Sequence, residues 1–302
     1  MPEKHAADGA NGAAVRAIGS KADGIGGGSS DRSVLRAAYR RIRRHDRLAL
    51  KILSVLLLIG IWSWATSSGA ISSLFFPSPS EVFKSAAALV ASGEIWGAVW
   101  ASAQRVFLGF GLAALIAVPL GIVLGVWWPA KAMFDPIISL LRPLPSITWV
   151  PLTILWLGIG EGQKIAIVFM GSWIYMLLYT LEATKRVDPL LIRAARNLGA
   201  SDFAVMREVI LPGALPGIIA GLKVTLAISW SCVITAEMVA AQTGLGALIW
   251  RAKDWGNLPL VLVGMLGISI TVLIADALAD ALERWLVPWE RHARASRNQK
   301  VN

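Results

Sequence analysis

The sequence predicts an all-α, polytopic membrane protein with six transmembrane helices. Composition, the length of the apolar runs and the placement of basic residues support this prediction. The chain has 302 residues, of which 56% are hydrophobic and 16% are charged, whereas soluble domains carry about 25% charged residues. Its one cysteine is Cys232, and its three histidines lie in the polar tails. These counts exclude an intrachain disulfide, a Cys-cluster metal site and His-rich metal chemistry in the apolar body, and they argue against a water-soluble enzyme.

Six stretches are long and apolar enough to cross a membrane, because about 20 mostly apolar residues span about 30 Å of hydrocarbon. They are residues 48–66, 106–128, 134–157, 164–181, 216–241 and 259–285. The third contains four prolines, so we expect a kinked or broken helix there. Its boundaries are the least defined, and five or seven spans are alternative counts.

Basic residues assign both termini to the cytoplasm, since cytoplasmic connections are enriched in Lys and Arg. Residues 1–47, 182–212 and 289–302 hold most of the 29 Lys and Arg residues. We expect a disordered, basic N-terminal tail over 1–47, a membrane domain over 48–288 and a C-terminal tail over 289–302. We interpret the basic stretch before the first span as contacting anionic lipid headgroups and not nucleic acid.

The connection 67–104 on the other side of the membrane is the longest and is largely uncharged. Residues 81–91 read as a short helix capped by Ser80. Two interpretations are open: a docking surface for an extracytoplasmic partner, or an interfacial helix lying on the membrane.

Small residues also suggest how the spans pack. Gly121 with Gly125, and Gly217 with Gly221, stand four residues apart, which predicts close helix–helix approach. Cys232 is interpreted as a small buried apolar residue.

The connection 182–212 is polar but has helical periodicity. A helix over 189–198 would place Leu190, Leu191, Ala194 and Leu198 on one face. Gly199 should end this helix in a conformation with positive φ, and Ser201 should cap a second short helix. Such an apolar face on a short loop has nothing of its own to pack against, so it predicts a cytoplasmic partner.

This loop resembles the signature of ATP-binding-cassette importer permeases. Family members typically read Glu-Ala-Ala, three residues, Gly, nine residues, Ile-x-Leu-Pro. The matching residues here are Ala194, Ala195, Gly199, Val209, Leu211 and Pro212, with Arg193 in place of the usual Glu and Val209 in place of the usual Ile. Other stretches resemble the nitrate/sulfonate/taurine branch: Pro77-Ser78-Pro79-Ser80-Glu81, Leu141-Arg142-Pro143-Leu144-Pro145, Leu155-Trp156-Leu157-Gly158, Ala236-Glu237-Met238 and Gly244-Leu245-Gly246 with Ile249. The resemblance covers about residues 48–290.

The resemblance implies a type I importer permease in a bacterial inner membrane. Two copies would form the pore, a cytoplasmic ATPase subunit would receive the coupling helix, and a periplasmic binding protein would deliver a small anion. The residues that the resemblance assigns to ATPase coupling are Arg193, Ala194, Ala195, Gly199 and Pro212. The chain has no Gly-x-x-x-x-Gly-Lys-Ser/Thr phosphate loop, so we expect ATP to be used by the separate subunit and no cofactor to be bound here.

Polar residues within the spans are candidates for the translocation pathway, because a charge in mid-membrane costs about 2.5–3.5 kcal/mol. They are Arg142, Lys223, Ser229, Ser231, Thr235 and Glu237. The two cations suit an anionic cargo, and the hydroxyls suit a polar path. As alternatives, the cations could snorkel or form structural pairs, and the hydroxyls could bond to backbone carbonyls one turn back.

The leading functional hypothesis is a permease subunit, without enzymatic activity, for a sulfonate, taurine or nitrate. A stand-alone secondary carrier or channel is an alternative, for which Glu237 is the one candidate ion-coupling carboxylate. An integral membrane enzyme is a weaker alternative, because no catalytic or metal-ligand grouping occurs in the apolar body. The sequence does not identify the anion, since selectivity in the family usually resides in the binding protein.

Overall fold

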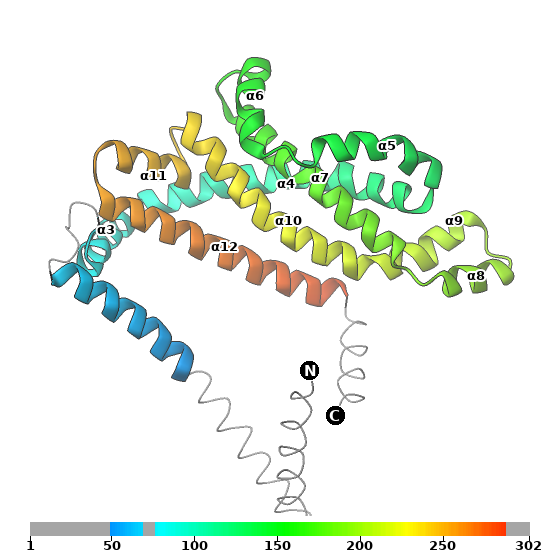
Figure 1. Ribbon diagram of the computed structural model, residues 1–302, viewed down its shortest axis with the longest axis horizontal. Coiled ribbons are helices and arrows are strands. Elements are labelled where there is room, and N and C mark those ends of the chain that lie inside the picture. Colours follow the sequence, from blue (N-terminus) through cyan, green and yellow to red (C-terminus); the bar gives the residue numbers. More distant parts are fainter. Residues whose placement is uncertain (1–48, 69–75, 288–302) are drawn as a thin grey trace, which may run out of the picture. The chain divides into compact units, whose positions relative to one another are not determined.

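A computed structural model describes residues 49–68 and 76–287, and every regular element in these ranges is helical (Figure 1). The all-α prediction is therefore confirmed for the described part of the chain. The proposed tails, 1–47 and 289–302, lie outside the described residues, so the predicted domain boundaries stay predictions.

Five helices are long and apolar enough to cross a membrane, and a bent pair makes up to six. The five are Ala49–Ser67, Glu94–Val126, Glu161–Lys185, Asp202–Val239 and Leu258–Leu286. The pair is Trp128–Leu141 with Ser146–Leu157, bent by 91°. The proline-rich third span is thus broken, as its sequence predicts. The helix Ala49–Ser67 belongs to a separate unit and exposes apolar side chains such as Leu50 and Leu53 along its length, as a lipid-facing helix does.

The larger unit consists of a succession of helices. They are α3 (Pro79–Ala91), α4 (Glu94–Val126), α5 (Trp128–Leu141), η1 (Ser146–Trp149), α6 (Val150–Leu157), α7 (Glu161–Lys185), α8 (Pro189–Asn197), α9 (Asp202–Val205), the π-helical η2 (Met206–Ile210), α10 (Leu211–Ala240), α11 (Leu245–Asp254) and α12 (Leu258–Leu286). In Figure 1, α8 and α9 lie at one end of α10 and α11 lies at the other.

Helix α7 packs against both α4 and α10, and glycines allow the close approach. A Cβ atom on Gly121 of α4 would lie 2.7 Å from the Cβ of Thr180. A Cβ atom on Gly125 would lie 2.6 Å from the Cβ of Thr184. On α10, a Cβ atom on Gly217 would lie 2.8 Å from that of Ala183. Gly221 likewise faces Tyr179 of α7. The predicted helix packing at these glycines is confirmed, and α7 is the helix that they contact.

The cap of α3 differs from the sequence prediction. The helix begins at Pro79 and its N-cap is Ser78, not Ser80. The Ser78 hydroxyl accepts a hydrogen bond from the backbone N–H of Glu81 at 3.4 Å, and the Glu81 carboxylate accepts from the backbone N–H of Ser78 at 2.8 Å. Ser78 and Glu81 have the spacing of a capping box, and Pro79 occupies the first helical position. These two features favour Ser78 as the cap, although Ser80 lies closer to Glu81 in the sequence.

Replacing Ser78 with alanine should lower the stability of α3 by about 1 kcal/mol, because one N-terminal amide loses its acceptor. We expect roughly fivefold faster hydrogen exchange of the first α3 amides, measured by mass spectrometry. Ser80→Ala is the control, since the Ser80 hydroxyl lies within hydrogen-bonding distance of the Ser78 hydroxyl, at 3.0 Å, and is not the N-cap acceptor. Equal exchange in the two variants would contradict the assigned cap.

The same cap should depend on pH. Hydrogen bonds from the backbone N–H and hydroxyl of Ser78 lower the pKa of the exposed Glu81 carboxyl. Because the pKa is lower in the folded state, the stabilisation is present above the unfolded pKa and is lost as the pH falls through the lowered value. Protection of the first α3 amides against hydrogen exchange, measured by mass spectrometry at several pH values, should therefore weaken only in acid.

Candidate functional site

The loop between α7 and α10 is built from two short capped helices. Asp188 caps α8, and its carboxylate accepts a hydrogen bond from the backbone N–H of Leu190 at 2.8 Å. Pro189 occupies the first turn, where its missing N–H is harmless. Ser201 caps α9 by accepting from the backbone N–H of Ala204 at 3.3 Å, as the sequence predicts.

Gly199 joins the two helices with a φ of 84°. The backbone N–H of Gly199 donates to the carbonyl of Arg196, and that of Ala200 donates to the carbonyl of Ala195, both at 3.0 Å. These two bonds form a Schellman motif, which needs a residue in the left-handed region at this position. The predicted helix end at Gly199 is confirmed.

The loop has an inner face that packs and an outer face that does not. Ile192, Ala195 and Ala200 pack against a buried apolar cluster, whose members are Ala183, Val187, Val205, Ile210, Ala214 and Ile218. The outer face, which we call the α8 face, consists of the exposed residues Leu190, Leu191, Arg193, Ala194, Leu198 and Phe203. Leu198 is 89% exposed and Phe203 is 74% exposed. The amphipathic pattern of the loop thus leaves an apolar surface facing away from the helix bundle.

The six candidate pathway residues are not gathered at one point. Arg142 is the exposed C-cap of α5, at the bend of the broken span. Lys223 and Glu237 are both on α10, fourteen positions and therefore about 21 Å apart along its axis. The hydroxyls of Ser229 and Thr235 donate to the backbone carbonyls of Thr225 and Ser231, at 2.9 and 3.0 Å, and the Ser231 side chain is exposed.

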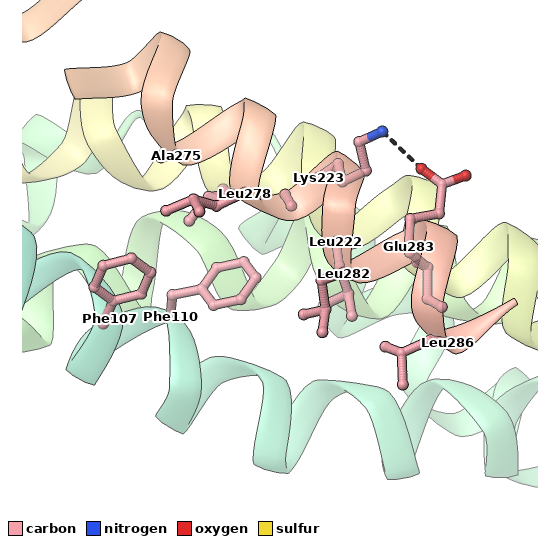
Figure 2. A pocket seen from close by; sticks show the side chains of 12 residues that line it. Phe107, Phe110, Leu222, Lys223, Ala275, Leu278, Leu282, Glu283 and Leu286 are labelled. Carbon is pink, nitrogen blue, oxygen red and sulfur yellow. Dashed lines mark hydrogen bonds and ion pairs between the residues drawn. The ribbon is translucent and has the colours of Figure 1, made fainter. Parts of the chain in front are cut away.

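Lys223 lies at the rim of an apolar cavity of about 360 Å³ between α4, α10 and α12. Figure 2 shows its amino group turned toward Glu283, 2.7 Å away, and it also pairs with Asp280. Phe107, Phe110 and leucines of α10 and α12 form most of the lining. Because two carboxylates already neutralise Lys223, the cavity offers no free cation to an anion.

A buried polar network at the α11 end was missed by the sequence prediction. It joins Ser102 and Arg105 of α4, Glu161 and Lys164 of α7, Glu237 of α10, and Thr243, Leu245 and Gly246 around the start of α11. Arg105 is only 3% exposed. The signal that could have revealed this network is Arg105, a basic residue within a long helical stretch. Charged residues inside a membrane normally have partners, so Arg105 predicts a buried ion pair.

Glycines shape the place where Glu237 lies in this network. A Cβ atom on Gly246 would lie 2.8 Å from the carbonyl oxygen of Ile234, and a Cβ atom on Gly244 would overlap the Glu237 carboxyl group. The Gly244-Leu245-Gly246 stretch therefore allows the start of α11 to close over this carboxylate.

Comparison with known proteins identifies the family. The family described as "Binding-protein-dependent transport system inner membrane component" matches residues 117–292, which is more than half of the chain. The chain belongs to this permease family. Its resemblance to ATP-binding-cassette permeases, noted from the loop motif, is confirmed.

Relatives of the permease cover most of its length. A probable ABC transporter permease of Brucella abortus is 35% identical over 246 residues, which cover 82% of the permease and 97% of that protein. The taurine transport system permease protein TauC of Escherichia coli is 34% identical over 248 residues, 80% of the permease and 90% of TauC. The putative aliphatic sulfonates transport permease SsuC of Escherichia coli is 32% identical over 232 residues, 77% and 88% of the two chains.

A solved structure shares the fold of the permease. The methionine ABC transporter MetNI, in an inward-facing conformation, matches with a TM-score of 0.59 and 24% sequence identity. The match covers 64% of the permease and 96% of that chain. The similarity confirms an importer-permease architecture for the helix bundle.

Proposed function

We propose that this permease is the membrane-spanning subunit of an ATP-driven importer that moves a small oxyanion-bearing cargo by alternating access. The cargo would be a sulfonate, taurine or nitrate, carried from periplasm to cytoplasm, and ATP would be hydrolysed by a separate subunit. Family membership and relatives named for taurine and sulfonates support this proposal. The observation that carries it is the exposed, apolar α8 face, which a capped helix and a glycine turn present to solvent.

The α8 face is the proposed contact with the ATPase subunit. Arg193 and Ala194 lie on its exposed side, whereas Ala195 packs inward and its carbonyl closes the Schellman motif. Gly199 sets the angle between α8 and α9, and Pro212 is an exposed residue in the first turn of α10. A movement of the ATPase subunit against the α8 face would then be transmitted to the membrane-spanning helix α10, because α9, η2 and α10 form one continuous helical run.

The remaining parts of the assembly follow from the same proposal. Both termini would be cytoplasmic in a bacterial inner membrane, a second copy would complete the pore, and a periplasmic binding protein would present the cargo. A stand-alone carrier would need an ion-coupling carboxylate. The candidate, Glu237, is instead bonded to Ser102, Arg105 and the backbone of Gly246, which disfavours that alternative.

Purification from the native host tests the proposal. We expect an ATPase subunit to co-purify, and uptake into proteoliposomes to require ATP and the binding protein. Affinities of that binding protein for taurine, alkanesulfonates and nitrate would then identify the cargo. Uptake by the isolated permease without ATP would contradict the proposal and favour a secondary carrier.

Arg142 is the cation that we propose to meet the cargo. Within the bundle, Arg105, Lys131, Lys164 and Lys223 each pair with a carboxylate. Arg142 takes part in none of the ion pairs found in the described ranges 49–68 and 76–287, and its side chain is exposed at the bend. Its position at the break of a membrane span suits a contact with a passing anion.

Replacing Arg142 with glutamine should reduce ATP-driven uptake at least about tenfold, because a hydrogen bond to a charged group contributes roughly 1.5–3 kcal/mol. Uptake of the labelled cargo by the reconstituted transporter measures the effect. Lys131→Gln, on the same helix but paired with Asp135, is the control and should change uptake little. Equal uptake by the parent and the Arg142 variant would remove Arg142 from the pathway.

A further inference from the structure

Arg105 has no hydrogen-bond donor left for a cargo. Its Nε donates to Glu161 at 2.6 Å, and Nη2 donates to Glu161 at 2.8 Å and to the Thr243 hydroxyl at 2.9 Å. Its Nη1 donates to Glu237 at 2.7 Å and to the backbone carbonyl of Thr243 at 2.6 Å. A guanidinium has five N–H donors, so every one of them is used within the protein.

Glu237 and Ser102 bond the first turn of α11. The Glu237 carboxylate accepts from the Ser102 hydroxyl at 2.8 Å and from the backbone N–H of Gly246 at 2.9 Å. The backbone N–H of Leu245 donates to the Ser102 hydroxyl at 2.9 Å. The first N–H groups of a helix have no partner inside it. Here, Ser102 of α4 and Glu237 of α10 accept hydrogen bonds from two of these N–H groups.

The two carboxylates that hold Arg105 differ in their exposure to solvent. The Glu237 side chain is fully buried, whereas the Glu161 side chain is 60% exposed. If Arg105 moved away, water could solvate the exposed Glu161 carboxylate, whereas the Glu237 carboxylate would stay buried without compensation. Glu161 also follows two glycines, of which Gly158 has a φ of 69° and Gly160 is the N-cap of α7. The α7 contact is therefore the one that can open.

We propose that Arg105 and Glu237 are positioning residues that fix α11 to α4 and α10 as one rigid body throughout transport. Glu161 is the releasable contact of this body. Movement at the α11 end then takes place at the glycine joint and the first turn of α7, and not between α11 and α4. The rest of α7 packs closely against α4 and α10. This proposal rests on the proposed transport function, but the fixation of α11 itself does not depend on transport.

A spin label on α11 tests the fixation in the isolated permease. Trp255 is the exposed C-cap of α11, and Leu273 is an exposed residue of α12. In the Trp255→Cys variant, Glu237→Ala should shorten the rotational correlation time of the label, and the near-isosteric Glu237→Gln should do so less. Glu161→Gln should leave it unchanged. A label at Leu273→Cys should stay unchanged in all three backgrounds, and the buried Cys232 should not react.

The outcomes of this measurement are decisive without any transport assay. A shorter correlation time at the Trp255 site alone, in the Glu237 variants, supports the fixation of α11 by Arg105 and Glu237. An unchanged label in Glu237→Gln and Glu237→Ala overturns it, as does an effect of Glu161→Gln equal to that of Glu237→Ala. Loosening at both label sites overturns it as well, because the change would then be general destabilisation.

A cross-link tests the rigid body during transport. Glu94 of α4 and Arg251 of α11 form an exposed ion pair at 3.2 Å and can be replaced by Glu94→Cys and Arg251→Cys. Joining the two thiols with a short bifunctional maleimide in the assembled transporter should leave ATP-driven uptake unchanged. Blocked uptake after cross-linking, with normal uptake before it, overturns the proposal. Absent uptake in the parent transporter would instead refute the proposed function and leave the spin-label result standing.

Discussion

Replacing Gly199 with valine is expected to abolish ATP-driven uptake while the permease stays in the membrane. The φ of 84° lies in the left-handed region, where an ordinary side chain costs about 1–2 kcal/mol and a β-branched one more. A Cβ atom at this position would meet nothing within 4 Å, so the strain is confined to the backbone. The chain should relieve it by opening the Schellman motif, and α8 would then turn its apolar face away from the ATPase subunit.

Two substitutions separate coupling from strain. Asparagine tolerates the left-handed region, so Gly199→Asn should retain most of the uptake. Gly93 has a φ of 79°, also with open space around its Cβ position, but it precedes α4 and lies outside the loop. Gly93→Val should therefore carry similar strain without loss of coupling. Measurements of uptake and ATP hydrolysis in the reconstituted transporter check this, and normal uptake by Gly199→Val would remove the coupling role.

The features of this site that the sequence predicts are the local ones. The helix end at Gly199, the Ser201 cap and the apolar face of α8 each depend on residues within one or two turns of one another. The close packing at the glycine pairs that face α7 is also predictable, because small residues spaced four apart in a membrane helix typically mark a helix–helix contact. The broken third span follows from prolines in the same way.

Long-range contacts explain what the sequence does not predict. The span expected to start at residue 106 begins instead at Glu94. The predicted apolar stretch starts just after Arg105, because a lone charge is unfavourable inside a membrane. The Arg105 partners Glu161, Glu237 and Thr243 are 56, 132 and 138 positions away in the sequence. No local pattern links them, so the sequence could point to Arg105 as a residue that needs partners but could not identify those partners.

The predicted fifth span shows a second kind of error. The apolar run predicts a start at Pro216, yet the helical run continues from Asp202 through both Pro212 and Pro216. The π-helical turn η2 precedes these prolines and carries the run into α10. Packing of Val205, Ile210 and Ala214 in one buried cluster supports this continuity.

Replacing Arg105 with alanine should destabilise the permease more than any other single change within the buried network. Truncation leaves Glu237 buried without its cation, and breaking a buried pair in this way costs about 3–5 kcal/mol. For a helical bundle of this size the Tm should fall by roughly 6–20 °C. Thermal unfolding of the detergent-solubilised protein, followed by circular dichroism, measures the effect.

Comparison with two further variants identifies the origin of that loss. Glu161→Gln should lower the stability by about 1 kcal/mol or less, because the Glu161 side chain is 60% exposed and Arg105 keeps its bonds to Glu237 and Thr243. The double variant Arg105→Gln with Glu237→Gln removes both charges and keeps polar groups near Gly246 and Ser102, so it should be more stable than Arg105→Ala. If Arg105→Ala unfolded at the same temperature as Glu161→Gln, Glu237 would not be an ionised group held by Arg105, and the rigid attachment of α11 would need another source.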